Sequence, residues 1–146
     1  MTVQIRQFLF IGFLIVHLCL FGQTENVIGN YEMKFEATNG TIIYKLALNA
    51  NGTFAFHFYS YIDRKIGQKD ENLYAKGTWK SNKNLIFFSS GSNDFDDKHT
   101  LDFNNTRARF ITKSPRNISD VEIKTSIQFY ESNITWIKRN TLLKTD

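Results

Sequence analysis

Residues 42–58 read IIYKLALNANGTFAFHF. Side chains alternate between the two faces of a β-strand, so Phe54, Phe56 and Phe58 must share one face. The preceding Asn51-Gly52 suits the positive φ angles of a tight hairpin turn, and every second residue before it is apolar. This stretch therefore predicts a β-hairpin whose phenylalanine ladder faces the core.

The rest of the chain repeats this pattern of short alternating runs, separated by clusters of Asn, Gly, Ser and Asp. Regularly spaced runs of this kind are typical of β-sandwiches and β-barrels. We predict strands at residues 28–36, 42–49, 53–61, 73–80, 84–89, 99–103, 107–113, 122–130 and 133–138. The links are short enough to join antiparallel neighbours, which predicts a meander.

Neighbouring predicted strands form the further hairpins: 73–80 with 84–89, 99–103 with 107–113, and 122–130 with 133–138. We expect an all-β fold in which an antiparallel meander of about eight or nine strands closes into a small barrel, because closure removes unpaired edges. An open β-sandwich is the alternative architecture.

Residues 1–22 have the composition of a secretory signal peptide. Arg6 is the one charged side chain in this segment, residues 8–21 are mostly apolar, and the small residue Gly22 precedes a polar stretch. The apolar run is shorter than the roughly 20 residues that a transmembrane helix needs. We expect cleavage near Gly22, a secreted or periplasmic location, and membrane contact only through the uncleaved leader. Residues 23–146 then form a single domain.

Cys19 is the only cysteine of the chain and lies inside the leader. A lipoprotein signal is the alternative reading of this residue, but such a signal needs a small residue before the cysteine and Leu18 stands there. We therefore favour cleavage without lipidation. The mature domain would then have no disulfide, no thiol nucleophile and no thiolate metal ligand.

The composition fits one small domain with a substantial core. The chain has 146 residues, of which 42% are hydrophobic and 14 are Phe, and this is enough for a single core. The formal net charge of +4 is mild, whereas proteins that hold nucleic acid phosphates are more basic, with the charge gathered on one face. We expect a monomer without a nucleic acid partner.

Three motifs together suggest a family resemblance. Gly29-Asn30-Tyr31 opens the domain, residues 46–54 read LALNANGTF, and Gly77-Thr78-Trp79 follows. In this order they resemble the short lipocalin-like barrels exported by bacteria, and the leader is similar to those of exported proteins from the Bacteroidetes. The resemblance implies a barrel that takes a small apolar or amphipathic ligand.

The motifs of common enzyme and metal sites are missing from the sequence. It has no Gly-x-Ser-x-Gly elbow, phosphate-binding loop or dinucleotide fingerprint. The two mature histidines, His57 and His99, are too few for a zinc site, and the acidic stretch 92–97 lacks the ligand spacing of a calcium loop. We expect no catalytic residue, no cofactor and no metal.

Aromatic residues provide the first candidate binding set. Tyr59, Tyr61 and Tyr74 sit in alternating strand positions, where they can line a ligand cavity or form a carbohydrate platform. Packing into the core is the usual role of aromatic residues in a small domain and is the competing interpretation.

A basic strand face provides the second candidate set. Arg107, Arg109 and Lys113 alternate on the face opposite Ala108 and Phe110. Such a stripe can hold an acidic protein, an anionic lipid or a glycan carboxylate. The competing interpretation is a solvated strand face that discourages edge pairing.

Two non-enzymatic hypotheses follow, with an enzyme as the third. One is a binding domain that carries a small apolar or amphipathic ligand in the barrel. The other is an interaction module of the cell envelope that binds a partner protein through Arg107, Arg109 and Lys113. The interior separates them, because packing of the phenylalanine ladder with Trp136 into one solid cluster would leave no room for a ligand.

Overall fold

The computed structural model describes residues 27–63, 68–114 and 116–145. The predicted signal peptide, its cleavage near Gly22 and the lipidation alternative at Cys19 lie outside these residues. The described elements are β1 (Gly29–Ala37), β2 (Gly40–Leu48), β3 (Thr53–Asp63), β4 (Gln68–Asn82), β5 (Leu85–Ser89), the 3-10 helix η1 (Ser92–Asp94), β6 (Arg107–Ile111), β7 (Ser126–Glu131), the 3-10 helix η2 (Thr135–Ile137) and β8 (Thr141–Thr145).

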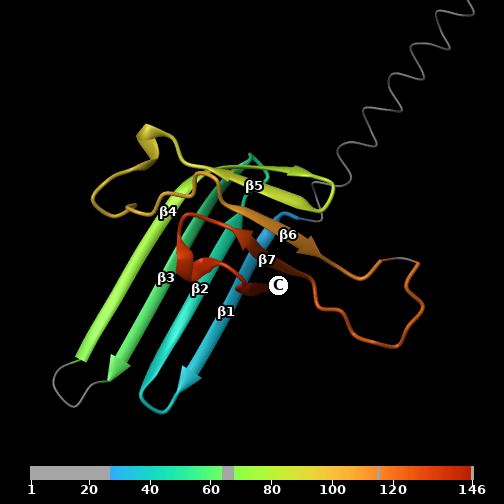
Figure 1. The fold of residues 1–146 in the computed structure, drawn as a ribbon, viewed down its shortest axis with the longest axis horizontal. Coiled ribbons are helices and arrows are strands. Elements are labelled where there is room, and N and C mark those ends of the chain that lie inside the picture. Colours follow the sequence, from blue (N-terminus) through green and yellow to red (C-terminus); the bar gives the residue numbers. More distant parts are fainter. Residues whose placement is uncertain (1–26, 64–67, 115, 146) are drawn as a thin grey trace, which may run out of the picture.

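The eight strands form a closed antiparallel barrel. Each strand pairs with the next in the chain, and β8 returns to pair with β1 (Figure 1). The predicted all-β meander barrel is thereby confirmed, and the alternative of an open sandwich is wrong. The hairpins β2–β3 and β4–β5 occur as predicted, with Gly52 at a φ of 80° in the first turn.

Residues 99–103 do not form the strand that we predicted. His99 makes only an isolated parallel bridge to Tyr74, and the partners of β6 are β5 and β7. The physical reason lies in Asp96, whose carboxylate accepts hydrogen bonds from the backbone N–H groups of Lys98 and His99. A local side-chain partner of this kind competes with strand pairing.

Residues 133–138 also differ from the predicted strand, because the 3-10 helix η2 occupies this place. Ser132 accepts a hydrogen bond from the Ile134 N–H, and Arg139 then takes a φ of 72°. The last strand is β8, which the sequence reading missed. The strand has five residues and its alternation is short, with Leu142 buried and Leu143 42% exposed.

Aromatic rings fill the centre of the barrel. Phe103 is fully buried, and its ring centroid lies 5.1 Å from that of Phe54 and 4.9 Å from that of Phe56. Trp136 adds a ring 6.4 Å from Phe56 and 4.7 Å from Phe58. The predicted core face of the β2–β3 hairpin is confirmed, and its phenylalanine ladder joins Trp136 in one cluster.

The two halves of the barrel differ in length. Strands β1 to β4 have 9 to 15 residues, whereas β5 to β8 have 5 or 6. β1 meets β8 only at residues 30–32, and β4 meets β5 only at residues 78–82. The four long strands therefore project beyond the barrel as a twisted sheet, which Figure 1 shows clearly.

Replacing Phe103 by Ala tests whether the barrel centre is solid. Loss of a ring that contacts four others should lower the free energy of unfolding by about 3–5 kcal/mol, measured by denaturant titration. Phe95→Ala is the matched control, because Phe95 is 41% exposed and its loss should change stability by less than about 0.5 kcal/mol. Equal effects of the two substitutions would contradict a packed interior.

Candidate functional site

The three tyrosines of the first candidate set lie on the outside of the barrel. β3 and β4 pair with Phe56 opposite Ala75 and His57 opposite Tyr74. Because Phe56 and Ala75 are buried, His57 and Tyr74 belong to the outer face, and Tyr59 and Tyr61 follow on the same face of β3. All three tyrosines are half-buried there rather than inside the barrel.

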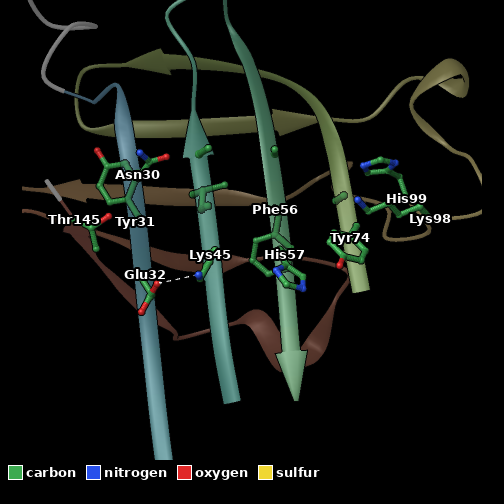
Figure 2. A pocket seen from close by; sticks show the side chains of 14 residues that line it. Asn30, Tyr31, Glu32, Lys45, Phe56, His57, Tyr74, Lys98, His99 and Thr145 are labelled. Carbon is green, nitrogen blue, oxygen red and sulfur yellow. Dashed lines mark ion pairs between the residues drawn. The ribbon is translucent and has the colours of Figure 1, made fainter. Parts of the chain in front are cut away.

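A groove of about 530 Å³ crosses this outer face, and we call it the outer groove (Figure 2). Ala47 and Ala55, adjacent small residues on β2 and β3, contribute to its lining. The other outward side chains are those of Asn30, Glu32, Lys45, His57, Tyr74, Lys98, His99 and Thr145. Tyr74 is thus the one residue of the predicted tyrosine set that lines the groove.

A stacked ring pair on β3 and β4 lines the outer groove (Figure 2). The rings of His57 and Tyr74 are nearly parallel, with an angle of 2° and a centroid separation of 4.4 Å. His57 Nε2 lies 2.8 Å from Oδ1 of Asn72, which holds the imidazole in this orientation. The pair follows from the register of β3 and β4, since the two residues are direct cross-strand neighbours.

The connection before β6 runs beside β4 at one end of the groove and brings a cation to this ring pair (Figure 2). The ammonium of Lys98 lies 4.4 Å from the centroid of the Tyr74 ring, a cation–π distance. The ring of His99 meets Tyr74 edge-on at 6.1 Å. On the β1 side, Lys45 Nζ lies 3.6 Å from Glu32 Oε2, a loose ion pair. The lining therefore carries two ammonium groups and one carboxylate, a formal excess of one positive charge.

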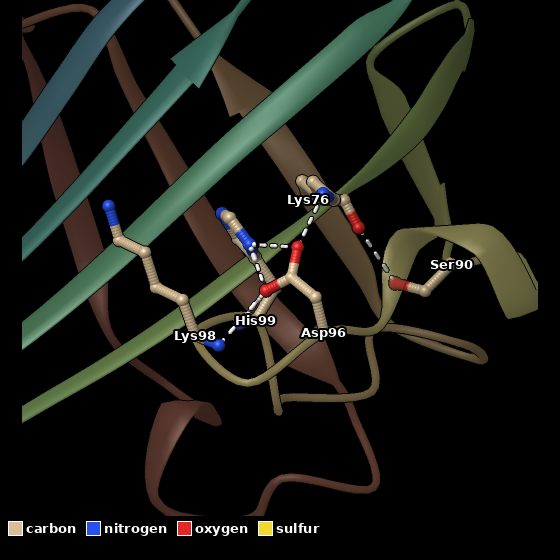
Figure 3. Close-up of polar contacts among 5 residues, drawn as sticks. All are labelled: Lys76, Ser90, Asp96, Lys98 and His99. Carbon is tan, nitrogen blue, oxygen red and sulfur yellow. Dashed lines mark hydrogen bonds and ion pairs between the residues drawn. The ribbon is translucent and has the colours of Figure 1, made fainter.

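Asp96 ties the connection to β4 and so positions Lys98 and His99 (Figure 3). Its carboxylate accepts hydrogen bonds from the Lys76 ammonium at 2.7 Å and from the two backbone N–H groups, and it lies 2.8 Å from His99 Nδ1. These hydrogen bonds hold the pKa of Asp96 well below its usual range. The bond from Lys76 contributes most, and the bonds from the backbone and side chain of His99 come next. Asp96 is therefore a charged anchor at ordinary pH.

The residues of the basic stripe have partners within the chain. Arg107 forms an ion pair with Glu131 at 3.2 Å, and the Arg109 guanidinium lies 5.1 Å over the ring of Tyr130. Lys113 follows the end of β6 and donates to the Ser119 carbonyl at 2.9 Å. The structure thus places Arg107 and Arg109 on the outer face of β6, which β5 and β7 separate from the strands that line the outer groove.

Within residues 27–63, 68–114 and 116–145, no group of three His, Cys, Asp or Glu side chains is arranged to hold a metal ion. The same part of the chain holds no helix of the length and apolar character that crossing a membrane requires. No protein-family model, curated protein or solved structure matches the chain.

Sequence reasoning identified Tyr74 but missed most of the residues that surround it. Lys45 and Lys98 look like ordinary solvated lysines in the sequence, and residues 92–97 look like an acidic turn. The cross-strand neighbours of Tyr74 depend on the β3–β4 register, which no turn motif in the sequence specifies. Only the spacing of His57 among the phenylalanines signals that it faces outward.

The anchoring role of Asp96 predicts a pH dependence. The pKa of Asp96 in the folded protein lies below the unfolded value of about 3.9, so its carboxylate stabilises the fold above that pH and this contribution is lost as the pH falls further. Asp96→Asn should lower stability near neutral pH and weaken the acid dependence, as measured by denaturant unfolding over a pH series.

Asp97→Asn is the control for this prediction, because Asp97 is an exposed neighbour whose side chain makes no hydrogen bond within the described part of the chain. The anchoring role would be refuted by identical acid profiles for Asp96→Asn and the unmodified protein.

Proposed function

We propose that the protein is a non-enzymatic binding domain, secreted or periplasmic, that holds a small amphipathic ligand in the outer groove. One observation carries the proposal: the His57–Tyr74 stack lies in a groove that also presents the ammonium groups of Lys45 and Lys98. The groove volume of about 530 Å³ falls within the usual range of small-ligand sites, about 300–1,000 Å³.

The packed interior argues against the ligand site inside the barrel that the sequence suggested, so the proposed site lies on the outer face. The cluster of Phe54, Phe56, Phe58 and Trp136 occupies the region where a carrier would hold an apolar ligand. The proposed ligand is still amphipathic, as the sequence suggested, but it binds in the outer groove and not inside the barrel. The lipocalin-like relationship belongs to the same proposal, and barrel closure is compatible with it.

The lining residues indicate the chemistry of the ligand. Ala47 and Ala55 present small apolar surfaces on which a ring can lie close to the sheet. Lys45 and Lys98 attract an anionic group, and charge-assisted hydrogen bonds to ammonium groups are the stronger kind. A ring compound with one apolar face and a carboxylate at its edge meets both requirements.

The groove geometry supports binding over catalysis. His99 beside Asp96 is the pair that comes closest to a general base with an orienting carboxylate. However, the same carboxylate also accepts hydrogen bonds from the Lys76 ammonium and from two backbone N–H groups. These bonds fix the loop to β4, which is a structural role. We therefore assign Asp96 and His99 a positioning role.

The alternative function, binding of an envelope protein through Arg107, Arg109 and Lys113, has less support. Arg107 is paired with Glu131, and Lys113 is held by a backbone carbonyl. An acidic partner would have to break these contacts before it could form its own ion pairs with Arg107 and Lys113.

Titration with matched ligands tests the outer groove. Benzoate and glucuronate should shift the amide signals of Lys45, His57, Tyr74 and Lys98 in NMR spectra, whereas benzamide and glucose should bind at least about tenfold more weakly because they lack the charge. Lys98→Glu should weaken the binding of both acids by a similar factor.

Arg109→Glu provides the control, since it makes the same charge reversal on the outer face of β6. The proposal fails when both acids bind equally to the unmodified protein and to the Lys98→Glu variant, or when their signals cluster at Arg107 and Arg109. Native mass spectrometry of protein from its own host can further reveal a retained ligand.

Export of the full chain tests the proposed location. When the full chain is expressed in a bacterial host with the leader of residues 1–22, we expect a periplasmic or secreted protein. Its measured mass should match a chain that starts at Gln23, because the expected cleavage follows Gly22. Leu14→Arg should block export, since it breaks the apolar run of the leader. An intact chain in the cytoplasm would contradict the proposal, and an added lipid mass on Cys19 would indicate the lipoprotein alternative.

A further inference from the structure

We propose that the free edge of β1 pairs with the same edge of a second copy of the chain, with Phe35 opposite its counterpart. This pairing would join the two projecting sheets into one continuous sheet. It concerns a different surface from the outer groove and departs from the monomer that the sequence suggested.

Within the described residues, the backbone edge of β1 that faces β8 is unpaired over about half of the strand. Its residues 30–32 pair with β8, whereas residues 33–37 pair with β2 alone. In the described part of the chain, no other backbone group is hydrogen-bonded to residues 33–37. β1 is also the outermost of the four long strands on its side of the sheet (Figure 1). Unpaired strand edges of this kind are templates for pairing with another chain.

The side chains on this edge leave an apolar residue exposed. Phe35 is 62% exposed although it lies on the inner face of β1, in line with the buried Tyr31. Lys34 and Glu36 flank it on the outer face and form an ion pair at 2.7 Å. Edge strands are usually protected from pairing by charged residues, proline or a covering segment, whereas this edge exposes a phenylalanine.

One antiparallel register of self-pairing gives Lys34, Phe35 and Glu36 complementary partners. When Phe35 faces Phe35 of the partner subunit in an antiparallel pair, Lys34 faces Glu36 of the partner subunit, and the reverse pair repeats this contact. Two opposite-charge pairs then lie on the outer face and two rings meet on the inner face, both of which stabilise paired strands.

Neighbouring registers are unfavourable. A shift that places Lys34 opposite the partner's Lys34, or Glu36 opposite the partner's Glu36, sets like charges against each other. A shift further toward the start of β1 needs residues 30–32, which β8 already occupies. An isologous contact across a two-fold axis is the commonest form of self-association.

The other open edge of the sheet lacks this complementarity. β4 meets β5 only at residues 78–82, so its first half is also unpaired on that side, apart from the contacts that Tyr74 and Lys76 make with the connection before β6. That part of the strand carries Asp70 and Glu71, two consecutive exposed acids. In an antiparallel pair of these edges centred on Asp70, Lys69 would face Glu71 of the partner subunit, but the two Asp70 carboxylates would face each other. The β1 edge has the apolar ring of Phe35 at that central position, which makes it the better match for a copy of itself.

Light scattering with size-exclusion chromatography on the exported protein tests the proposal through a concentration series. The unmodified protein should form a dimer at high concentration. Lys34→Glu and Glu36→Lys should each raise the dimer dissociation constant by about tenfold or more, because each turns two attractive pairs into repulsive ones. The double variant Lys34→Glu with Glu36→Lys restores both pairs and should bring the constant back close to the original value.

Lys80→Glu is the charge control, because Lys80 is exposed on β4 away from the β1 edge, and it should leave the dimer intact. Circular dichroism of every variant separates loss of pairing from loss of folding.

Phe35→Cys reports on the register. The paired Cα atoms of an antiparallel ladder lie about 4.5–5.5 Å apart, within the range that a disulfide bridges, so oxidation should link the two copies. Met33→Cys should not form this link, because Met33 lies opposite Ala37 of the partner subunit in the proposed register. A monomer at all concentrations, a dimer unaffected by Lys34→Glu, a double variant that stays monomeric, or capture of a different polypeptide at this edge would each overturn the proposal.

Discussion

The ring of Phe103 lies between those of Phe54 and Phe56 at the centre of the barrel, at centroid separations of 5.1 and 4.9 Å. These contacts join the connection before β6 to the β2–β3 hairpin, so they hold together segments that are distant in the sequence. Offset and tilted aromatic packing stabilises such a centre beyond the burial of apolar area. Because the centre is filled, the inward face of the long strands is committed to packing within the closed part of the barrel. Chemistry that needs solvent or a ligand is left to the outward face.

That division explains the position of the outer groove. The residue after each inward phenylalanine must point outward, so His57 follows Phe56 and meets Tyr74 across the β3–β4 ladder. The groove becomes a defined recess because Asp96 anchors the connection before β6 against Lys76 of β4. The anchor places Lys98 over the Tyr74 ring. Binding chemistry therefore arises from a strand register and a loop anchor acting together.

Unequal strand lengths have a second structural result. The short strands β5 to β8 close the barrel at one end of the long ones, so the outer parts of β1 and β4 extend past their closing partners. Closure removes edges only where all eight strands are present. The projecting sheet keeps two half-free edges. Their side chains differ, with alternating opposite charges around Phe35 on β1 and consecutive acids on β4. The same construction that forms a wide outer face therefore also leaves an edge capable of pairing.

The sequence by itself determined the all-β barrel, the inward phenylalanine ladder and the β2–β3 and β4–β5 hairpins, because a two-residue period and local turn residues are readable without long-range contacts. Other features were not readable from these patterns. The Asp96 anchor removed the strand expected at 99–103, and the turn after Ser132 replaced the strand expected at 133–138. The stacking of His57 on Tyr74 and the approach of Lys98 depend on a register and a loop path that no local motif specifies. Only the tertiary structure decided the ring stack and the position of Lys98, because their partners lie far apart in the chain. The two lost strands instead reflect local side-chain hydrogen bonds that compete with strand pairing.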